Sequence, residues 1–234
     1  MTAVIRATVF DLDDTLVDTR HLWPKACAAF TVHHGHRWRA EDTAALHGNG
    51  AWADYVAGLG DGTATPDEVT TVCTDSMIIE VEAGHVRALP GAVDLVLEAT
   101  RYGPVAVATA SPRRFVHAAL DRTGLTGLLH TVICGEDVTR PKPAPDAYQR
   151  AAVALGIPTG ECLAVEDSPN GIRSAHAAGM HVLAVARDDT TLPADISALV
   201  TAYTDSAIQA RPALTRLLSA AARPGLPAEP QPTP

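Results

Sequence analysis

Three short segments carry residues whose types and spacing could do phosphoryl chemistry. They are Asp11-Leu12-Asp13-Asp14-Thr15, Arg140-Pro141-Lys142-Pro143 and Glu166-Asp167-Ser168. The chain has sixteen arginines and only two lysines. An arginine-rich composition that keeps a lysine at position 142 suggests a need for a compact ammonium group instead of a planar guanidinium group. Four of these five carboxylates, Asp11, Asp13, Glu166 and Asp167, together with the lysine make a site for a divalent cation and a phosphoryl group.

Five short apolar runs are expected to position these segments. Their composition is typical of strands that are buried on both faces of a parallel sheet, and helical stretches separate them in the manner of an α/β fold. In such sheets, ligands bind beyond the carboxyl ends of the strands, where the polar groups of this chain fall. The predicted strands cover residues 7–11, 105–109, 131–134, 162–166 and 182–186.

The helices between the strands carry start signals that involve proline. Ser111-Pro112 and Ser168-Pro169 each place a hydroxyl before a proline, which predicts an N-cap followed by the first helical residue. Pro145 is expected to open a further helix that ends near Gly156.

The pattern of buried strands is interrupted between the first and the second of them. Residues 19–87 resemble helices and loops, and they contain Trp23, Trp38, Trp52 and a glycine-rich stretch over 48–62. We therefore expect a core formed by residues 1–18 and 88–222, with residues 19–87 as an inserted helical cap. The proline-rich residues 223–234 are expected to be a disordered tail.

Composition limits the classes of function. The chain has 234 residues, of which 47% are hydrophobic, and its net charge of −9 argues against nucleic acid as a partner. No apolar run approaches the length of a membrane span. The four cysteines are scattered and no secretory signal is evident, which predicts reduced thiols in a cytoplasmic protein.

Four motifs in order along the chain resemble the haloacid dehalogenase superfamily. They are residues 11–15, the strand that ends at Thr109, the Lys142 loop and residues 166–171. Within the superfamily, the chain is similar to the β-phosphoglucomutase-like phosphatases with a helical cap, and the similarity covers everything up to the tail. It implies a Rossmann-like parallel-sheet core and a Mg²⁺ ion. One departure is Asp14, where many members have glycine, and aspartate tolerates unusual turn dihedrals.

The resemblance also implies roles for individual residues of the core. Asp11 would attack phosphorus to form an aspartyl phosphate, and Asp13 would protonate the leaving group and later activate water. Thr109 and Lys142 would hold phosphate oxygens. The metal ligands would be Asp11, the backbone carbonyl of Asp13 and Asp167, with Glu166 as a ligand or as a partner of one.

Two further regions are expected to touch the substrate. Ser111 follows the strand that ends at Thr109, so it belongs to the same edge of the sheet. Asn49, Gly50 and Trp52 would form a cap loop that faces the leaving group of the substrate.

Alternative functions remain open. β-Phosphoglucomutases carry a histidine in the first cap helix and an arginine in the cap loop, whereas residues 22–24 and 48–52 of this chain have neither. Hydrolysis of a small phosphorylated metabolite is therefore favoured over a phosphosugar mutase, and a non-catalytic binder is disfavoured. The metabolite could be a sugar phosphate, phosphoglycolate or a biosynthetic intermediate, and we expect a monomer or a weak homodimer. We interpret the histidine cluster over residues 33–36 as polar surface, not as a metal site.

Overall fold

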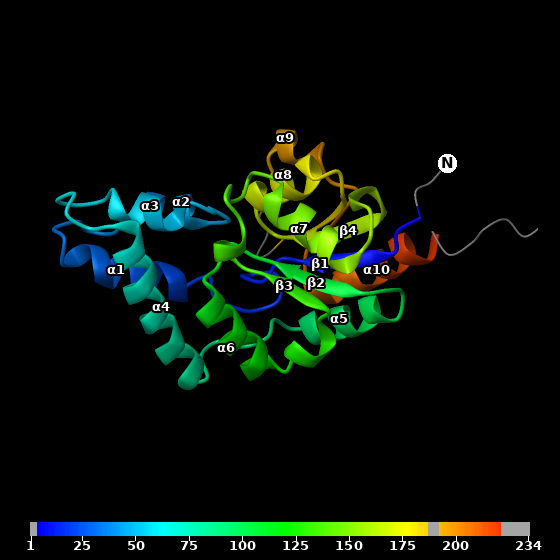
Figure 1. The fold of residues 1–234 in the computed structure, drawn as a ribbon, viewed down its shortest axis with the longest axis horizontal. Coiled ribbons are helices and arrows are strands. Elements are labelled where there is room, and N and C mark those ends of the chain that lie inside the picture. The colour runs from blue at the N-terminus through cyan, green and yellow to red at the C-terminus, as the bar shows by residue number, and fades with distance from the viewer. Residues whose placement is uncertain (1–3, 187–191, 221–234) are drawn as a thin grey trace, which may run out of the picture.

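A parallel sheet of six strands forms the centre of the molecule (Figure 1). The computed structural model describes residues 4–186 and 192–220. The five predicted strands are confirmed to within a residue or two, and the sixth was not predicted. In spatial order the strands are β3 (Thr131–Ile133), β2 (Val105–Ala108), β1 (Ala7–Phe10), β4 (Cys162–Glu166), β5 (His181–Val185) and β6 (Ala202–Thr204).

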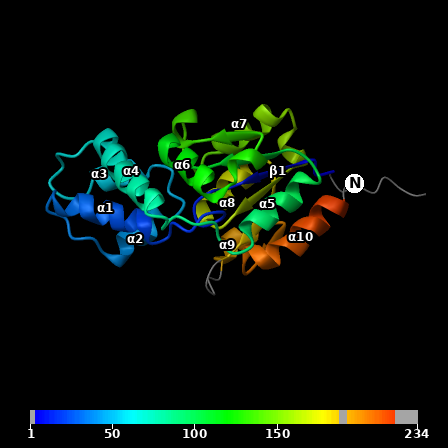
Figure 2. The same cartoon turned by 90° about the horizontal axis from the view of Figure 1, so that it is seen from below.

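Helices cover both faces of the sheet because the side chains of each strand alternate between two apolar layers. Val9 belongs to the layer under α7, α8 and α9, whereas Phe10 belongs to the layer under α5, α6 and α10. Figure 1 shows α7, α8 and α9 above the sheet and α5 and α6 below it, and Figure 2, seen from below, shows α5 beside α10. The helices are α5 (Ala92–Thr100), α6 (Arg113–Thr123), α7 (Asp146–Leu155), α8 (Pro169–Ala177), α9 (Ala194–Ser197) and α10 (Ala207–Ala220), with short 3-10 helices η1 (Thr126–Leu128), η2 (Gly135–Asp137) and η3 (Thr159–Glu161).

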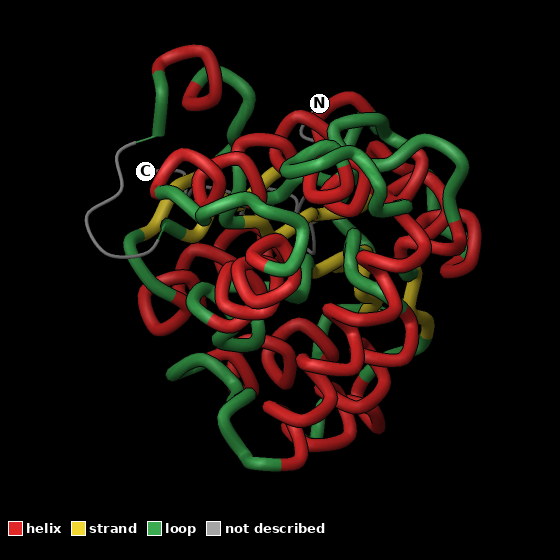
Figure 3. The backbone as a smooth tube through the Cα atoms, turned by 90° about the vertical axis from the view of Figure 1, so that its left-hand side faces the viewer, coloured by secondary structure: helices red, strands yellow, loops and turns green. Residues whose placement is uncertain are grey.

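The segment 19–87 is described throughout and contains helices but no strand. Its helices are α1 (Leu22–Val32), α2 (Ala40–Leu46), α3 (Trp52–Ala57) and α4 (Pro66–Glu82). They lie beyond the sheet, at the end opposite to the chain's N-terminus (Figure 1), and they dominate that end when it faces the viewer (Figure 3).

Two neighbouring chain segments join these helices to the sheet. The backbone N–H of Asp18 donates to the carbonyl of Arg87 at 2.9 Å, and the N–H of Leu89 donates to the carbonyl of Leu16 at 2.9 Å. The entry and exit of the helical segment therefore run side by side.

One of the two predicted serine caps is confirmed. Ser168 accepts a hydrogen bond from the N–H of Gly171 at 3.1 Å at the start of α8. Ser111 does not cap α6: residue 112 is the N-cap, and the carboxylate of Glu136 accepts from the N–H of Arg113 at 3.0 Å instead. The hydroxyl of Ser111 donates to Oδ2 of Asp13 instead.

The expected tail at residues 223–234 lies outside the described residues. Of the helices that are described, none has both the length and the apolar character needed to cross a lipid bilayer.

Candidate active site

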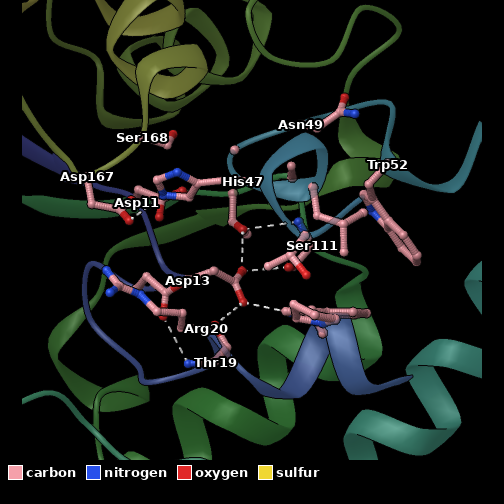
Figure 4. A pocket seen from close by; sticks show the side chains of 18 of the residues that line it. Asp11, Asp13, Thr19, Arg20, His47, Asn49, Trp52, Ser111, Asp167 and Ser168 are labelled. Atoms are coloured by element: carbon pink, nitrogen blue, oxygen red, sulfur yellow. Dashed lines mark hydrogen bonds and ion pairs between the residues drawn. The ribbon is translucent and has the colours of Figure 1, made fainter. Parts of the chain in front are cut away.

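The carboxyl ends of β1, β2 and β4 meet the helical segment around a cavity of about 310 Å³ (Figure 4). Strand β1 lies between β2 and β4, so the chain crosses to opposite sides of β1 and leaves a crevice there. The predicted residues that line this cavity are Asp11, Asp13, Asn49, Trp52, Thr109, Ser111, Lys142 and Asp167.

Lys142 lies at the bottom of the site, with its side chain only 2% exposed. Its Nζ lies 2.7 Å from Oδ1 of Asp11, 2.6 Å from Oε1 of Glu166 and 5.0 Å from the ring centre of Tyr148. Burial alone would lower the pKa of Lys142, but the charges of Asp11 and Glu166 outweigh burial and raise that pKa above its ordinary value. The ammonium group therefore stays charged.

Glu166 accepts hydrogen bonds at both carboxylate oxygens. Oε1 takes the hydroxyl of Tyr148 at 2.8 Å besides Lys142, and Oε2 takes the backbone N–H groups of Asp167 at 3.0 Å and Ser168 at 3.1 Å. Burial alone would raise the pKa of Glu166, but Lys142 and these hydrogen bonds lower it. A Cβ at Gly171 would lie within 2.2 Å of three atoms of this carboxylate, so the fit requires glycine.

Asp11 and Asp167 form an acidic pair beside Glu166. One ligand atom from each of the three carboxylates lies within 4.8 Å of the others, and they form a cluster that could hold a metal ion. Burial raises the pKa of Asp11 well above its usual range, and the charge of Lys142 opposes this only in part. Burial also raises the pKa of Asp167. The negative charge of the three clustered carboxylates therefore exceeds the positive charge that Lys142 supplies.

Asp13 is held by four donors from three parts of the chain. Its Oδ1 accepts from the indole Nε1–H of Trp23 at 2.8 Å and from the hydroxyl of Thr19 at 2.9 Å. Its Oδ2 accepts from the hydroxyls of Ser111 at 2.6 Å and Thr109 at 3.3 Å. The carboxylate is thereby aimed into the cavity from the turn after β1 (Figure 4).

The conformation of the turn that carries Asp13 depends on Asp14. Asp14 has φ of 60°, in the left-handed region, as expected for a position where glycine is common. The side chain of Asp14 accepts from the backbone N–H of Thr19 at 3.2 Å, which closes the turn.

The loop from α2 to α3 contacts the core directly. His47 Nε2 lies 3.0 Å from Oδ2 of Asp167, and this hydrogen bond raises the pKa of His47. The backbone N–H of Gly50 donates to the carbonyl of Lys142 at 3.3 Å. Gly48 approaches Ser168 so closely that a Cβ would lie 2.3 Å from the Ser168 hydroxyl. The helical segment is therefore closed onto the residues that carry the charges.

The structure brings together the residues that the sequence predicted for the site. Gly50 and Glu166 do not line the cavity, but both contact Lys142. Sequence reasoning missed Thr19, Arg20, Trp23 and His47, which line it. The missed signals were the position of His47 directly before the glycine loop and the position of Thr19 four residues after the end of the first motif.

The histidine cluster of residues 33–36 lies apart from this site. His36 Nε2 lies 2.9 Å from Oδ2 of Asp42, and His34 lies 3.2 Å from the hydroxyl of Thr63. Among the described residues, the cluster of Asp11, Glu166 and Asp167 is the one group of three with metal-ligand spacing.

Comparisons with known proteins agree with this arrangement. A family model of haloacid dehalogenase-like hydrolases matches residues 5–179. Hexitol phosphatase A of Escherichia coli (strain K12) is 34% identical over 181 residues, covering 76% of this chain and 81% of that protein. Fructose-1-phosphate phosphatase YqaB of the same organism is 30% identical over 182 residues, covering 76% of this chain and 94% of that protein.

Solved structures share the fold. A variant of CbbY from Rhodobacter sphaeroides in complex with xylulose-(1,5)bisphosphate has a TM-score of 0.76 and 25% identity, covering 88% of this chain and 96% of that one. The parallel sheet with helices on both faces is thus the α/β Rossmann-like fold of this group.

Proposed function

We propose a reaction and a set of residue roles for this chain, which belongs to the haloacid dehalogenase-like hydrolase family. It is a phosphoric monoester hydrolase. The reaction that we propose is the Mg²⁺-dependent hydrolysis of a small phosphorylated metabolite through an aspartyl-phosphate intermediate. The observation that carries this proposal is the buried contact of Lys142 with Asp11 next to the acidic pair of Asp11 and Asp167.

Asp11 is the proposed nucleophile. A carboxylate oxygen of Asp11 attacks phosphorus, the bond from phosphorus to the leaving oxygen breaks, and that oxygen takes a proton from Asp13. In the second step Asp13 takes a proton from water, which attacks the aspartyl phosphate and frees Asp11 and inorganic phosphate. The four hydrogen bonds to Asp13 support its role because they hold it at the mouth of the cavity.

The donors for the phosphate oxygens would come from the core. Thr109 and Ser111 follow β2, and their hydroxyls already point at the same oxygen of Asp13. Lys142 would hold a phosphate oxygen, and its charge favours the anionic form of Asp11. Preorganised donors of this kind stabilise charge in the transition state.

The acidic pair fits a divalent cation. Asp11 and Asp167 would supply carboxylate oxygens and Asp13 its backbone carbonyl, which suits the preference of Mg²⁺ for oxygen ligands. We propose that Glu166 positions Lys142 instead of binding the ion, because both its oxygens already accept hydrogen bonds. When bound, the cation offsets the charges of the carboxylates and of the phosphate.

Residues 19–87 are the proposed cap domain, and residues 1–18 with 88–222 are the proposed core. The paired connections at residues 16–18 and 87–89 support a cap that opens for substrate and product. The names of the relatives, a fructose-1-phosphate phosphatase and a hexitol phosphatase, favour a sugar phosphate over the other candidate metabolites.

The proposal includes a compartment and an assembly state. All four cysteines are buried and unpaired, which supports a reducing compartment such as the cytoplasm. A monomer or a weak homodimer would suffice because the cavity is lined within one chain.

A phosphate-release screen tests the proposed reaction. We expect release from a panel of phosphorylated metabolites and from acetyl phosphate with Mg²⁺, and loss of release with EDTA. The Asp11→Asn variant should fold, as judged by its melting temperature, and release no phosphate above background. Turnover by a folded Asp11→Asn variant would contradict the assignment of the nucleophile.

A further inference from the structure

The cavity has a second half that the reaction itself does not use. The first half holds the charged groups at the carboxyl ends of the strands. The second half faces it from the cap and would surround whatever is bonded to the phosphate. Its apolar wall consists of Trp23, Pro24, Cys27, Ala44, Leu46 and Trp52, and the polar cap residues Thr43, His47 and Asn49 also line the cavity.

Two indole rings dominate this wall. The ring centres of Trp23 and Trp52 lie 5.1 Å apart with the planes tilted by 52°, and both side chains are part-buried. Trp23 is fixed by the edge of Phe115, whose ring centre lies 5.2 Å away, and by its hydrogen bond to Asp13. Fixed aromatic faces suit the C–H bonds of a sugar or sugar alcohol, since they offer apolar contact at little entropic cost.

None of the six residues of the apolar wall carries a charge. Among the described residues that line the cavity, the cationic or ionisable basic side chains are Arg20, His47 and Lys142. Lys142 is bonded to Asp11 and Glu166, and His47 to Asp167. In Figure 4, Arg20 extends to the side of Asp11, away from Trp52. A second phosphate on the leaving group would therefore face indoles and aliphatic carbons.

Such a dianion would lose water without gaining a partner. A buried charge without a counter-ion is strongly disfavoured, and the carboxylates of Asp13 and Asp167 across the cavity would repel it. The cavity volume of about 310 Å³ lies at the small end of the ~300–1,000 Å³ range of ligand pockets, which suits one sugar unit.

We infer that the substrate is the monophosphate of a neutral polyhydroxylated compound, a sugar or a sugar alcohol of one unit, and that sugar bisphosphates are rejected. The inference rests on the proposed function, because it concerns the leaving group of the same reaction. The cap wall of Trp23 and Trp52 selects the substrate by contact with its apolar face, and the lack of a cation there excludes a second phosphate.

Matched pairs of esters test this inference. Fructose 1-phosphate is compared with fructose 1,6-bisphosphate, and glucose 1-phosphate with glucose 1,6-bisphosphate, with acetyl phosphate as a substrate without a sugar. We expect kcat/KM to favour at least one monophosphate over its bisphosphate by roughly 10- to 100-fold, the range for a charged group that loses its hydrogen-bonding partners.

The possible failures can be told apart. The inference is overturned if the bisphosphate is hydrolysed as well as its monophosphate in both pairs. Hydrolysis of acetyl phosphate alone overturns it too but leaves the proposed function standing. If none of these substrates, acetyl phosphate included, is hydrolysed, the proposed function itself is contradicted.

A cation placed in the wall should change the preference. Ala44 is exposed at the rim of the cavity on α2, where a long side chain can be accommodated. Ala44→Arg should raise kcat/KM for the bisphosphate relative to the monophosphate at least about 10-fold, and the uncharged control Ala44→Gln should not. Equal effects of the two variants would contradict the role of charge.

The indole wall is tested by Trp52→Ala. This change should lower kcat/KM for the sugar monophosphate by about 10-fold or more while that for acetyl phosphate changes little. Trp38, which lies off the cavity and donates to Thr43, provides the control Trp38→Ala. Equal losses for both esters in a Trp52→Ala protein of normal melting temperature would contradict the inference.

Discussion

At the scale of single residues, the site depends on close contacts between buried charged groups. Lys142 contacts two carboxylates and a tyrosine ring, and only 4% of the residue is exposed. A guanidinium group in that space would have to displace Asp11 or Glu166. Charge alone is therefore not what the position requires.

The first prediction follows from that packing. Lys142→Arg should lower kcat by about 10²-fold or more, because displacement of the nucleophile by even about 1 Å has an effect of this size. The chain's other lysine supplies the control: Lys25 is exposed and bonded to Glu80 at 2.6 Å, so Lys25→Arg should leave kcat unchanged. Steady-state kinetics of both variants decide it, and near-normal kcat for Lys142→Arg would refute the argument.

The second prediction separates proton transfer from metal binding. Asp13→Asn keeps an oxygen to accept from Trp23 and Thr19, and its new amide can donate to Ser111. The side chain should therefore keep its place, while kcat falls by the ~10²–10⁴ that general acid–base catalysis supplies. Calorimetric titration should show Mg²⁺ affinity close to that of the exposed control Asp54→Asn. A large loss of Mg²⁺ affinity would assign Asp13 to the metal instead.

Residue types and their order were enough to predict the charged half of the site. Asp11, Lys142 and Asp167 follow apolar runs, and the carboxyl ends of parallel strands necessarily converge. Two partners of Asp13, Trp23 and Thr19, could not be predicted from the sequence, because their positions depend on the path of the chain between the core and the cap. The prediction of Ser111 as a helix cap was wrong, because a serine before a proline has the same sequence pattern whether its hydroxyl points to the helix or to the cavity.

At the scale of elements, strands with continuous apolar runs were predictable and the edge strand was not. Strand β6 has the sequence Ala-Tyr-Thr, is three residues long and has Tyr203 exposed, so it shows neither burial on both faces nor a run of apolar residues. The cap helices were predicted only as a group. The close approach of Gly48 to Ser168 and of Gly50 to the Lys142 loop, which places the α2–α3 loop, appears only when the core is in place.

The third prediction concerns the loop between α2 and α3. A Cβ at Gly50 would lie 2.5 Å from the side chain of Pro141 and 2.6 Å from the backbone nitrogen of Lys142. Gly50→Ala should push the cap loop off the core and lower kcat/KM for a sugar phosphate by about 10²-fold, with a smaller loss for acetyl phosphate. In the control Gly160→Ala, the new methyl group meets nothing within 4 Å. Equal losses for both esters would show that the Lys142 loop had moved instead.

At the scale of the whole molecule, the fold gathers more negative charge than it neutralises. The net charge is −9, and the strand ends concentrate Asp11, Glu166 and Asp167 within one cluster under the cap. Glu166 is paired with Lys142, whereas the pKa values of Asp11 and Asp167 are raised mainly by burial. Burial of this cluster under the cap therefore lowers the stability of the folded state unless a carboxylate takes up a proton or the cluster binds a cation.

The last prediction is that Mg²⁺ stabilises the protein more as the pH rises. An aspartate whose pKa is raised by folding contributes stability below its unfolded value, about 3.9, and that contribution is lost as the pH rises through the folded pKa. Without metal, the melting temperature should therefore fall over the pH interval above about 3.9 more steeply in the wild-type chain than in Asp11→Asn or Asp167→Asn. Mg²⁺ binds the ionised carboxylates and releases their protons, so the rise in melting temperature that it causes should grow over the same interval and shrink in both variants. A Mg²⁺ effect that is independent of pH in the wild-type chain would mean that the cluster is already ionised without the ion, and that burial does not govern its charge.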